Sequence, residues 1–241
     1  MMVNLIKTSN SGKFSKSSIP DKIKAEMIAK KIWSSNCPVA LDRLQLLNLS
    51  YVDYDNKDHH NGQMIVFDVI ADSVLTIFHT LYQKRFPLFD IRLINDFNGD
   101  DGLSLQANNS SCFNCRKILN TNKYSIHSYG MAIDINPVQN PYLFTAPEGK
   151  SIEILPTEGM KYINRTKVKF GMAESQIDDS TGLTVIELFK MHGLSNWGGD
   201  WDFPDWQHFQ VPTEEAKTLA TLSFDEGYKY FNSIKNKAKI K

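Results

Sequence analysis

Two short segments of this 241-residue chain concentrate side chains that can bind a metal ion. Residues 125–134 read SIHSYGMAID and contain His127 and Asp134. Residues 197–210 read WGGDWDFPDWQHFQ and contain Asp205 and His208. Imidazole nitrogens and carboxylate oxygens both suit a borderline-soft cation such as zinc. The two segments are therefore candidates to supply the ligands of a zinc ion.

The spacing of His127 and Asp134 requires a break in the backbone between them. They are an odd number of positions apart, so on one uninterrupted strand their side chains would point to opposite faces. Gly130 lies between them and can adopt the conformations that a turn or a bulge needs. Ala132 leaves room beside Asp134. We therefore expect the two side chains to converge only if the chain turns at Gly130.

The second segment places Asp205 and His208 three residues apart. On one helical turn, that spacing puts both side chains on the same side, and Pro204 would start such a turn well. One residue could then bind the metal while the other handles a proton.

Three protein ligands and a water molecule are typical of catalytic zinc, whereas structural zinc has four protein ligands. Zinc lowers the pKa of its bound water to ~7, and a nearby carboxylate can accept the released proton and return it to a leaving amine. Asp205 is the candidate for that carboxylate. Each piece taken alone also has a structural interpretation, since a lone His or a strand Asp is often only hydrogen-bonded and WGGDW could be a simple turn.

The elements that must position these residues follow from hydrophobic spacing. Residues 131–136 alternate as a strand with one apolar face and one face carrying Asp134. HFQV at residues 208–211 is also strand-like, and residues 87–96 suit a short strand. Apolar residues at helical spacing predict helices from Asp21 and over Val69–Gln83. Residues typical of helix starts and ends predict a helix near Thr184–His192, ended by Gly193, and another after Pro212.

This pattern predicts a single α+β domain over residues 20–241. Residues 1–19 are rich in Ser, Asn and Lys and are expected to form a flexible lead-in. The lysines of residues 229–241 are expected to belong to a solvated terminus.

Composition limits the partners. The hydrophobic fraction is 41% and the charged fraction 22%, as in ordinary globular proteins. Lys plus Arg equals Asp plus Glu at 27 each, which leaves no excess charge for nucleic acid. No stretch approaches the ~20 apolar residues of a membrane span. The first residues also show no signal peptide, so we expect either a protein that stays inside or one whose leader has been removed.

The three cysteines, Cys37, Cys112 and Cys115, are an odd number and do not describe a disulfide framework. Cys112 and Cys115 form a CxxC, but no second CxxC or CxxH completes a structural zinc site. Ordinary packing is therefore the favoured interpretation of this pair.

The two segments together resemble the zinc D-Ala-D-Ala carboxypeptidase family, which includes D,D-dipeptidases and the L-alanyl-D-glutamate endopeptidases of phage lysis. The first segment follows the family's SxHxxGxAxD pattern, and the second contains its WGGDW turn followed by a carboxylate and a final His-Phe. The similarity extends roughly over residues 51–211. Several branches of the family carry Glu where Asp205 stands, while others carry Asp.

The resemblance implies a role for each matching residue. His127, Asp134 and His208 would bind one zinc ion per chain, and Asp205 would be the general base. Arg116 would hold the substrate or stabilise the oxyanion, because its planar fork stays charged and pairs with oxygen anions; a surface ion pair is the alternative. Further substrate contacts would come from Ser125, Trp197 and Asp200.

The implied fold is a small antiparallel sheet flanked by helices, like that of the hedgehog domain and the D,D-peptidases, with zinc in a surface cleft. The implied function is hydrolysis of peptidoglycan stem peptides or muropeptides next to a D-residue by a monomer that is periplasmic or secreted. A non-catalytic zinc-containing binding module of the same fold is the alternative. Retention of Asp205 beside His208 favours the enzyme, since a binding site needs no base.

Overall fold

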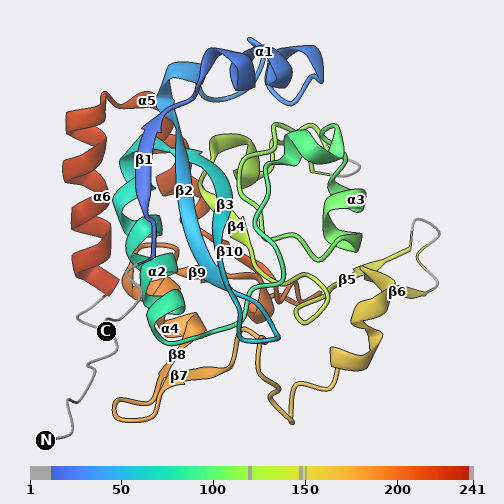
Figure 1. Ribbon diagram of the computed structural model, residues 1–241. Helices are drawn as coiled ribbons and strands as arrows, with labels where there is room; N and C mark the ends of the chain where they lie inside the picture. The colour runs from blue at the N-terminus through green and yellow to red at the C-terminus, as the bar shows by residue number, and fades with distance from the viewer. Residues whose placement is uncertain (1–11, 119–120, 147–148, 150, 239–241) are drawn as a thin grey trace, which may run out of the picture.

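The computed structural model describes residues 12–118, 121–146, 149 and 151–238 (Figure 1). Its main sheet is antiparallel with strand order β1-β2-β3, formed by β1 (Ser15–Ser18), β2 (Leu44–Val52) and β3 (Asp58–Phe67). Helix α2 (Ala71–Gln83) packs against β2 through the apolar face that its helical spacing predicts, with Val74, Ile77 and Leu81 fully buried. A short 3-10 turn at residues 68–70 leads directly into α2. The turn and α2 together cover the predicted helix over Val69–Gln83, which is therefore confirmed.

A second, smaller antiparallel sheet has the order β4-β10-β9, formed by β4 (Ala132–Asp134), β10 (His208–Gln210) and β9 (Asn196–Trp197). In Figure 1 it lies beside the main sheet, and one continuous apolar core joins the two. Two further hairpins flank it, β5 (Tyr142–Thr145) with β6 (Ile152–Leu155) and β7 (Gln176–Asp178) with β8 (Leu183–Thr184).

The remaining helices surround these sheets: α1 (Asp21–Ala29), α3 (Asp101–Gln106), α4 (Val185–Met191), α5 (Thr213–Thr221) and α6 (Phe224–Ala238). Helix α4 begins at a capping box, in which the Thr184 hydroxyl accepts from the Glu187 N–H and the Glu187 carboxylate accepts from the Thr184 N–H. It ends before Gly193, whose φ of 93° few other residues adopt. Small antiparallel sheets with helices around them confirm the α+β class.

Two expectations from the sequence need correction. Ser15–Ser18 of the expected lead-in pair with β2, while residues 1–11 lie outside the described residues. The expected strand over residues 87–96 is irregular chain with isolated bridges up to Leu93, followed by a 3-10 turn over Ile94–Phe97, and Phe89 is 54% exposed. The lysine-rich terminus is helical as far as Ala238; α6 buries Phe231 against the core and leaves Lys229 exposed, which does not contradict the expected solvated terminus.

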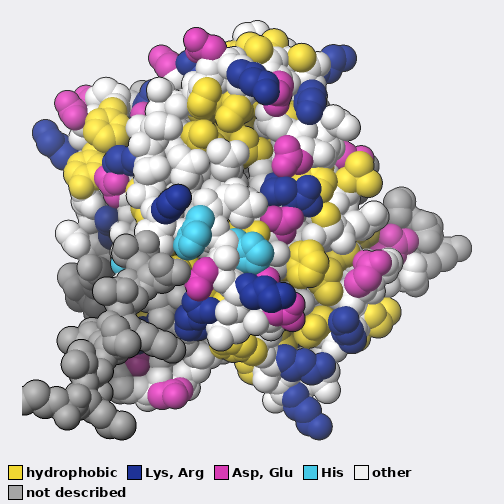
Figure 2. Space-filling view, in the orientation of Figure 1, with side chains coloured by type: hydrophobic (Ala, Val, Ile, Leu, Met, Phe, Trp, Pro, Cys, Tyr) yellow, Lys and Arg dark blue, Asp and Glu magenta, His cyan; other side chains and the backbone are white. Residues whose placement is uncertain are grey.

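None of the helices in the described part of the chain combines the length and the apolar character needed to cross a membrane. On the face shown in Figure 2, lysines and arginines are interspersed with aspartates and glutamates. This mixture agrees with the equal numbers of basic and acidic residues in the chain.

The cysteines are paired differently from the expectation. Cys37 and Cys115 form a disulfide across 78 positions of sequence, and Cys112 is free and buried. The packing interpretation therefore holds for Cys112 and is wrong for Cys115. Two hydrogen bonds lie beside the disulfide, from the Cys115 N–H to the Ile32 carbonyl (3.3 Å) and from the Tyr124 hydroxyl to the Asn36 carbonyl (2.6 Å). The disulfide and these hydrogen bonds thus connect residues 32–37, which belong to no family signature, to the segment that leads into residues 125–134.

We predict that Cys37→Ser lowers the free energy of unfolding by about 2–4 kcal/mol, because the cross-link closes a long loop and restricts the unfolded chain. Urea denaturation of the oxidised protein measures the loss. The Cys37→Ser/Cys115→Ser double variant should match the single one, and reductant should bring the wild type to the same stability. A single variant as stable as the oxidised wild type would contradict a stabilising role for the bond.

Candidate metal centre

Strand pairing brings Asp134 and His208 together. In the antiparallel pair of β4 and β10, His208 lies directly opposite Asp134. Directly opposed residues of an antiparallel pair project from the same face of the sheet, so these side chains meet although 74 positions separate them. The His208 Nδ1 lies 3.0 Å from the Asp134 Oδ1.

A turn before β4 brings in His127. This residue lies in a 3-10 turn (Ile126–Tyr129) that the Ser125 hydroxyl caps by accepting the His127 N–H at 3.3 Å. Gly130 ends the turn with φ 66°, and a Cβ there would lie 2.8 Å from the Phe67 nitrogen. The backbone break expected between His127 and Asp134 is therefore confirmed, and only glycine fits both its conformation and its close packing.

The ligand atoms of His127, Asp134 and His208 all lie within 4.8 Å of one another. The His127 Nε2 is 3.2 Å from the Asp134 Oδ2 and 3.1 Å from the His208 Nδ1. Ligands at zinc–ligand distances of 2.0–2.1 Å in a tetrahedron would be about 3.3 Å apart, so the observed separations fit a tetrahedral ion. The three residues are only 3–6% exposed. They form a group that could hold a metal ion.

The second nitrogen of each imidazole has its own partner. The His127 Nδ1 lies 2.7 Å from the Cys112 carbonyl oxygen, and the His208 Nε2 lies 2.8 Å from the Gln210 Oε1. Both partners are acceptors, so each of these ring nitrogens carries the proton and donates. In the neutral form of each ring, the His127 Nε2 and the His208 Nδ1 then carry a lone pair that faces the common centre, as in histidine metal ligands oriented by a second hydrogen bond.

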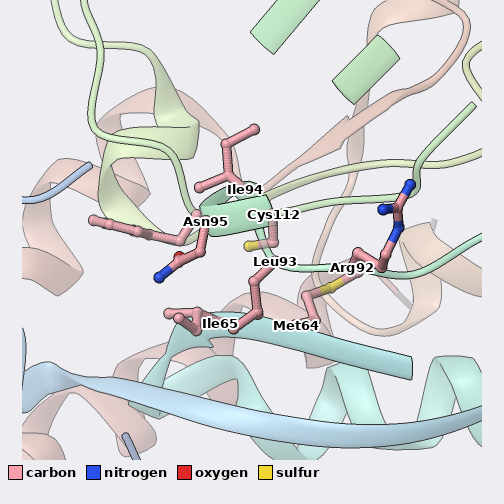
Figure 3. Close-up of a pocket in the computed structure, with 8 residues that line it drawn as sticks. Met64, Ile65, Arg92, Leu93, Ile94, Asn95 and Cys112 are labelled. Atoms are coloured by element: carbon pink, nitrogen blue, oxygen red, sulfur yellow. The ribbon is translucent and has the colours of Figure 1, made fainter. Parts of the chain in front are cut away.

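The Cys112 thiol belongs to the packing around this support. It lines a small cavity of about 10 Å³ together with Leu93, Ile94 and Asn95 (Figure 3). Burial is the main cause that raises the pKa of the Cys112 thiol well above its usual value. The thiol therefore stays neutral, and the backbone carbonyl is the part of Cys112 that reaches the metal centre.

The pKa values of Asp134 and His208 are shifted by the neighbouring groups of this site. Burial alone would raise the pKa of Asp134, but the neighbouring His127 and His208 imidazoles hold it well below its usual range. Burial alone would lower the pKa of His208, but its hydrogen bond to Asp134 and that residue's charge raise it instead. An ionised carboxylate therefore remains stable at the centre of a buried site, as a cation ligand requires.

Asp205 lies beside this group in a different conformation from the one expected. The predicted helical turn is a tight turn in which the His208 N–H donates to the Asp205 carbonyl at 3.1 Å, and β10 begins at His208. The carboxylate accepts a hydrogen bond from the Gln207 Nε2 at 3.0 Å. Burial first, and then the negative charge of Asp134, raise the pKa of Asp205 to about 7. Such a group can both accept and release a proton near neutral pH.

Arg116 is held by backbone contacts with the segment that carries His127. Its carbonyl accepts from the Ser125 N–H at 3.1 Å and the Ser128 hydroxyl at 2.7 Å. Its guanidinium pairs with Asp101 at 2.8 Å, so the ion-pair alternative is observed. The Arg116 Nε is buried and has no hydrogen-bond partner among the described residues. The rest of the guanidinium is partly exposed, so its terminal nitrogens can donate to a further acceptor.

Two of the residues expected to contact substrate make contacts within the protein. Trp197 is 8% exposed, stacks on Phe209 and donates its indole N–H to the Trp206 carbonyl at 3.0 Å. Asp200 lies on the surface in an ion pair with Lys190 at 3.3 Å. The structure thus shows Trp197 packed in the core and Asp200 in a surface ion pair. A substrate contact from either residue stays a prediction. Ser125 acts on His127 through the cap described above, and a substrate contact from it stays a prediction.

Sequence reasoning missed two residues near the group. The Trp201 ring is 38% exposed and lies 5.3 Å, centroid to centroid, from the His208 ring. Tyr142 pairs with Asp205 through an isolated antiparallel bridge. Trp201 could have been found from its place in the WGGDW turn. Nothing in the local sequence indicated Tyr142, because its neighbour is distant in the chain.

Residues 119–211 match the family model for D-alanyl-D-alanine carboxypeptidase. This match confirms the family resemblance. The matched peptidase segment includes His127, Asp134, Asp205 and His208, and it supports a metallopeptidase that acts on peptidoglycan. It begins after Arg116, so extension of the resemblance over residues 51–118 stays a prediction. No curated protein and no solved structure matches the chain.

We predict that Gln210→Leu weakens metal binding about 10–100-fold, because the His208 ring loses the acceptor that orients it. Competition with a chromophoric chelator measures the affinity. Gln176→Leu, which changes an exposed glutamine of β7, is the matched control and should bind as the wild type does. Unchanged affinity in Gln210→Leu would show that the hydrogen bond does not support the metal site.

Proposed function

We propose that this protein is a zinc metallopeptidase that hydrolyses peptidoglycan stem peptides next to a D-amino acid. The observation that carries the proposal is the convergence of three buried metal-binding side chains, with Asp205 adjacent, inside the segment that matches the peptidase family. The bond cleaved would be either the terminal D-alanyl-D-alanine bond or an internal L-alanyl-D-glutamate bond.

Zinc is the metal that the donor set suits best. Two imidazoles and one carboxylate are borderline ligands, and three protein ligands leave a tetrahedral position for water or substrate. When bound, zinc supplies a Lewis acid that makes water nucleophilic at neutral pH. His127, Asp134 and His208 would bind one ion per chain.

Asp205 would manage the proton in the proposed reaction. Its carboxylate accepts a proton as water attacks the scissile carbonyl carbon, and it returns that proton to the nitrogen of the leaving amine when the C–N bond breaks. Its pKa of about 7 suits both transfers, because a much stronger acid would accept the proton poorly and a much weaker one would not release it. Gln207 orients the carboxylate through the hydrogen bond at 3.0 Å.

Arg116 would stabilise the negative charge that develops on the carbonyl oxygen. Its pairing with Asp101 fixes the guanidinium, and the side chain is 34% exposed, so a substrate oxygen could approach its terminal nitrogens. A preorganised cation contributes most when the charge appears in the transition state.

The disulfide supports a location outside the cytoplasm. Disulfides persist in oxidising compartments and are rare in reducing ones. Stem peptides of peptidoglycan also lie outside the cytoplasmic membrane. A periplasmic or secreted enzyme therefore accounts for both the cross-link and the proposed substrate.

Incubation with purified muropeptides tests the proposal directly. We expect mass spectrometry to show cleavage next to a D-residue, loss of cleavage after treatment with a chelator, and recovery on addition of zinc. Metal analysis should find about one zinc per chain, as expected of a mononuclear catalytic site. A protein that binds zinc and muropeptides without cleaving them would instead be the non-catalytic binding module.

We predict that Asp205→Asn lowers kcat by about 10²–10⁴-fold, because the amide keeps the size of the side chain but cannot accept a proton. Zinc content should stay at the wild-type level, since Asp205 is not one of the proposed ligands. Asp202→Asn, at an exposed position three residues before Asp205, is the matched control and should keep full activity. Near-normal turnover in Asp205→Asn would mean that another group is the base.

A further inference from the structure

Tyr142 shares a face of the structure with Asp205. The two residues form an isolated antiparallel bridge, and the bonds from the Leu143 N–H to the Pro204 carbonyl (2.8 Å) and from the Trp206 N–H to the Pro141 carbonyl (3.4 Å) flank it. Residues directly opposed in such a pair have Cβ atoms about 4.5–5.5 Å apart on the same side. The phenol ring therefore stands beside the carboxylate of the proposed base.

The ring of Tyr142 is fixed while its hydroxyl is free. The ring is half-buried and stacks on Phe144 with a centroid separation of 5.3 Å and an interplanar angle of 24°. Among the described residues, no group makes a hydrogen bond with the Tyr142 hydroxyl in the structure. A rigid ring that presents an unpaired hydroxyl is suited to bind an external acceptor, because little side-chain freedom is lost on binding.

Two charged groups of the proposed active site act on this hydroxyl. Burial and the negative charge of Asp205 raise the pKa of Tyr142 above its usual value, and the positive charge of Arg116 partly offsets that rise. The phenol is therefore within electrostatic range of both side chains, and it remains protonated at neutral pH. In that state it is a hydrogen-bond donor and does not compete with Asp205 as a base.

We propose that Tyr142 is a further catalytic residue, whose hydroxyl donates a hydrogen bond to the carbonyl oxygen of the scissile peptide bond as that oxygen gains negative charge. The proposal rests on the peptidase function proposed above. The proton stays on the tyrosine, so the step changes neither the number of protons nor the redox state of the site. Tyr142 and the partly exposed guanidinium of Arg116 would form a pair of donors next to the base.

Kinetics of Tyr142→Phe test this role on the muropeptide that the wild type cleaves. Removing one donor to an oxyanion typically costs about 10²–10³-fold in kcat, so we expect a fall of that order with little change in KM. The phenylalanine keeps the ring and its stack on Phe144, so zinc content and thermal unfolding should match the wild type. A residue with only a structural role would not produce this separation of kcat from KM.

Tyr162→Phe is the matched control, because Tyr162 is another half-buried tyrosine of the same region and its ring lies next to Lys161 and Lys169. It should keep wild-type kinetics. An unchanged kcat in Tyr142→Phe, with an active wild type, would overturn the inference and leave the peptidase function standing. A wild-type protein that cleaves no muropeptide would overturn the proposed function, and the inference with it.

Discussion

The pairing of β4 with β10 is the contact on which the rest of the site depends. It sets Asp134 opposite His208, and the turn at Gly130 then brings His127 against both. The continuation of the same chain, through the tight turn before β10, places Asp205 next to the group. Because the side-chain period of a strand is two, a shift of this register by one residue would turn His208 away from Asp134. Stacking of Phe209 with Phe189 and with Trp197 opposes such a shift.

Burial of three polar, ionisable side chains imposes a second constraint. Such groups are destabilising unless each polar atom has a partner. In this site, the Cys112 carbonyl accepts a hydrogen bond from His127, and the Gln210 side chain accepts one from His208. The other nitrogen of each ring faces the common centre, where it could bind a cation. Cys112 lies in the segment that the Cys37–Cys115 disulfide fastens to the N-terminal region. The support of the metal centre therefore extends into a part of the chain without any family signature.

Local patterns predicted much of the fold. Apolar residues at helical spacing predicted α2. Helix α4 was predicted from Thr184 at its start and Gly193 after its end. The alternation over residues 131–136 predicted β4. Residues 87–96 alternate equally well but form no strand, because a strand also needs a partner along its length. Residues 15–18 lack an apolar pattern and yet form β1, because β2 offers them a free edge. Strand pairing is a long-range property that local spacing does not encode.

The sequence by itself determined the chemical types at the site: the two histidines, the aspartate between them, the second aspartate near His208, and the break at Gly130. These follow from residue identity and short spacing. Only the tertiary structure decided which residues surround them. It paired Cys37 with Cys115, buried Trp197 in the core, set Arg116 against Asp101 and placed Tyr142 beside Asp205. Each of these contacts joins residues far apart in the chain, or depends on what covers a side chain, and the packing of the whole domain determines both.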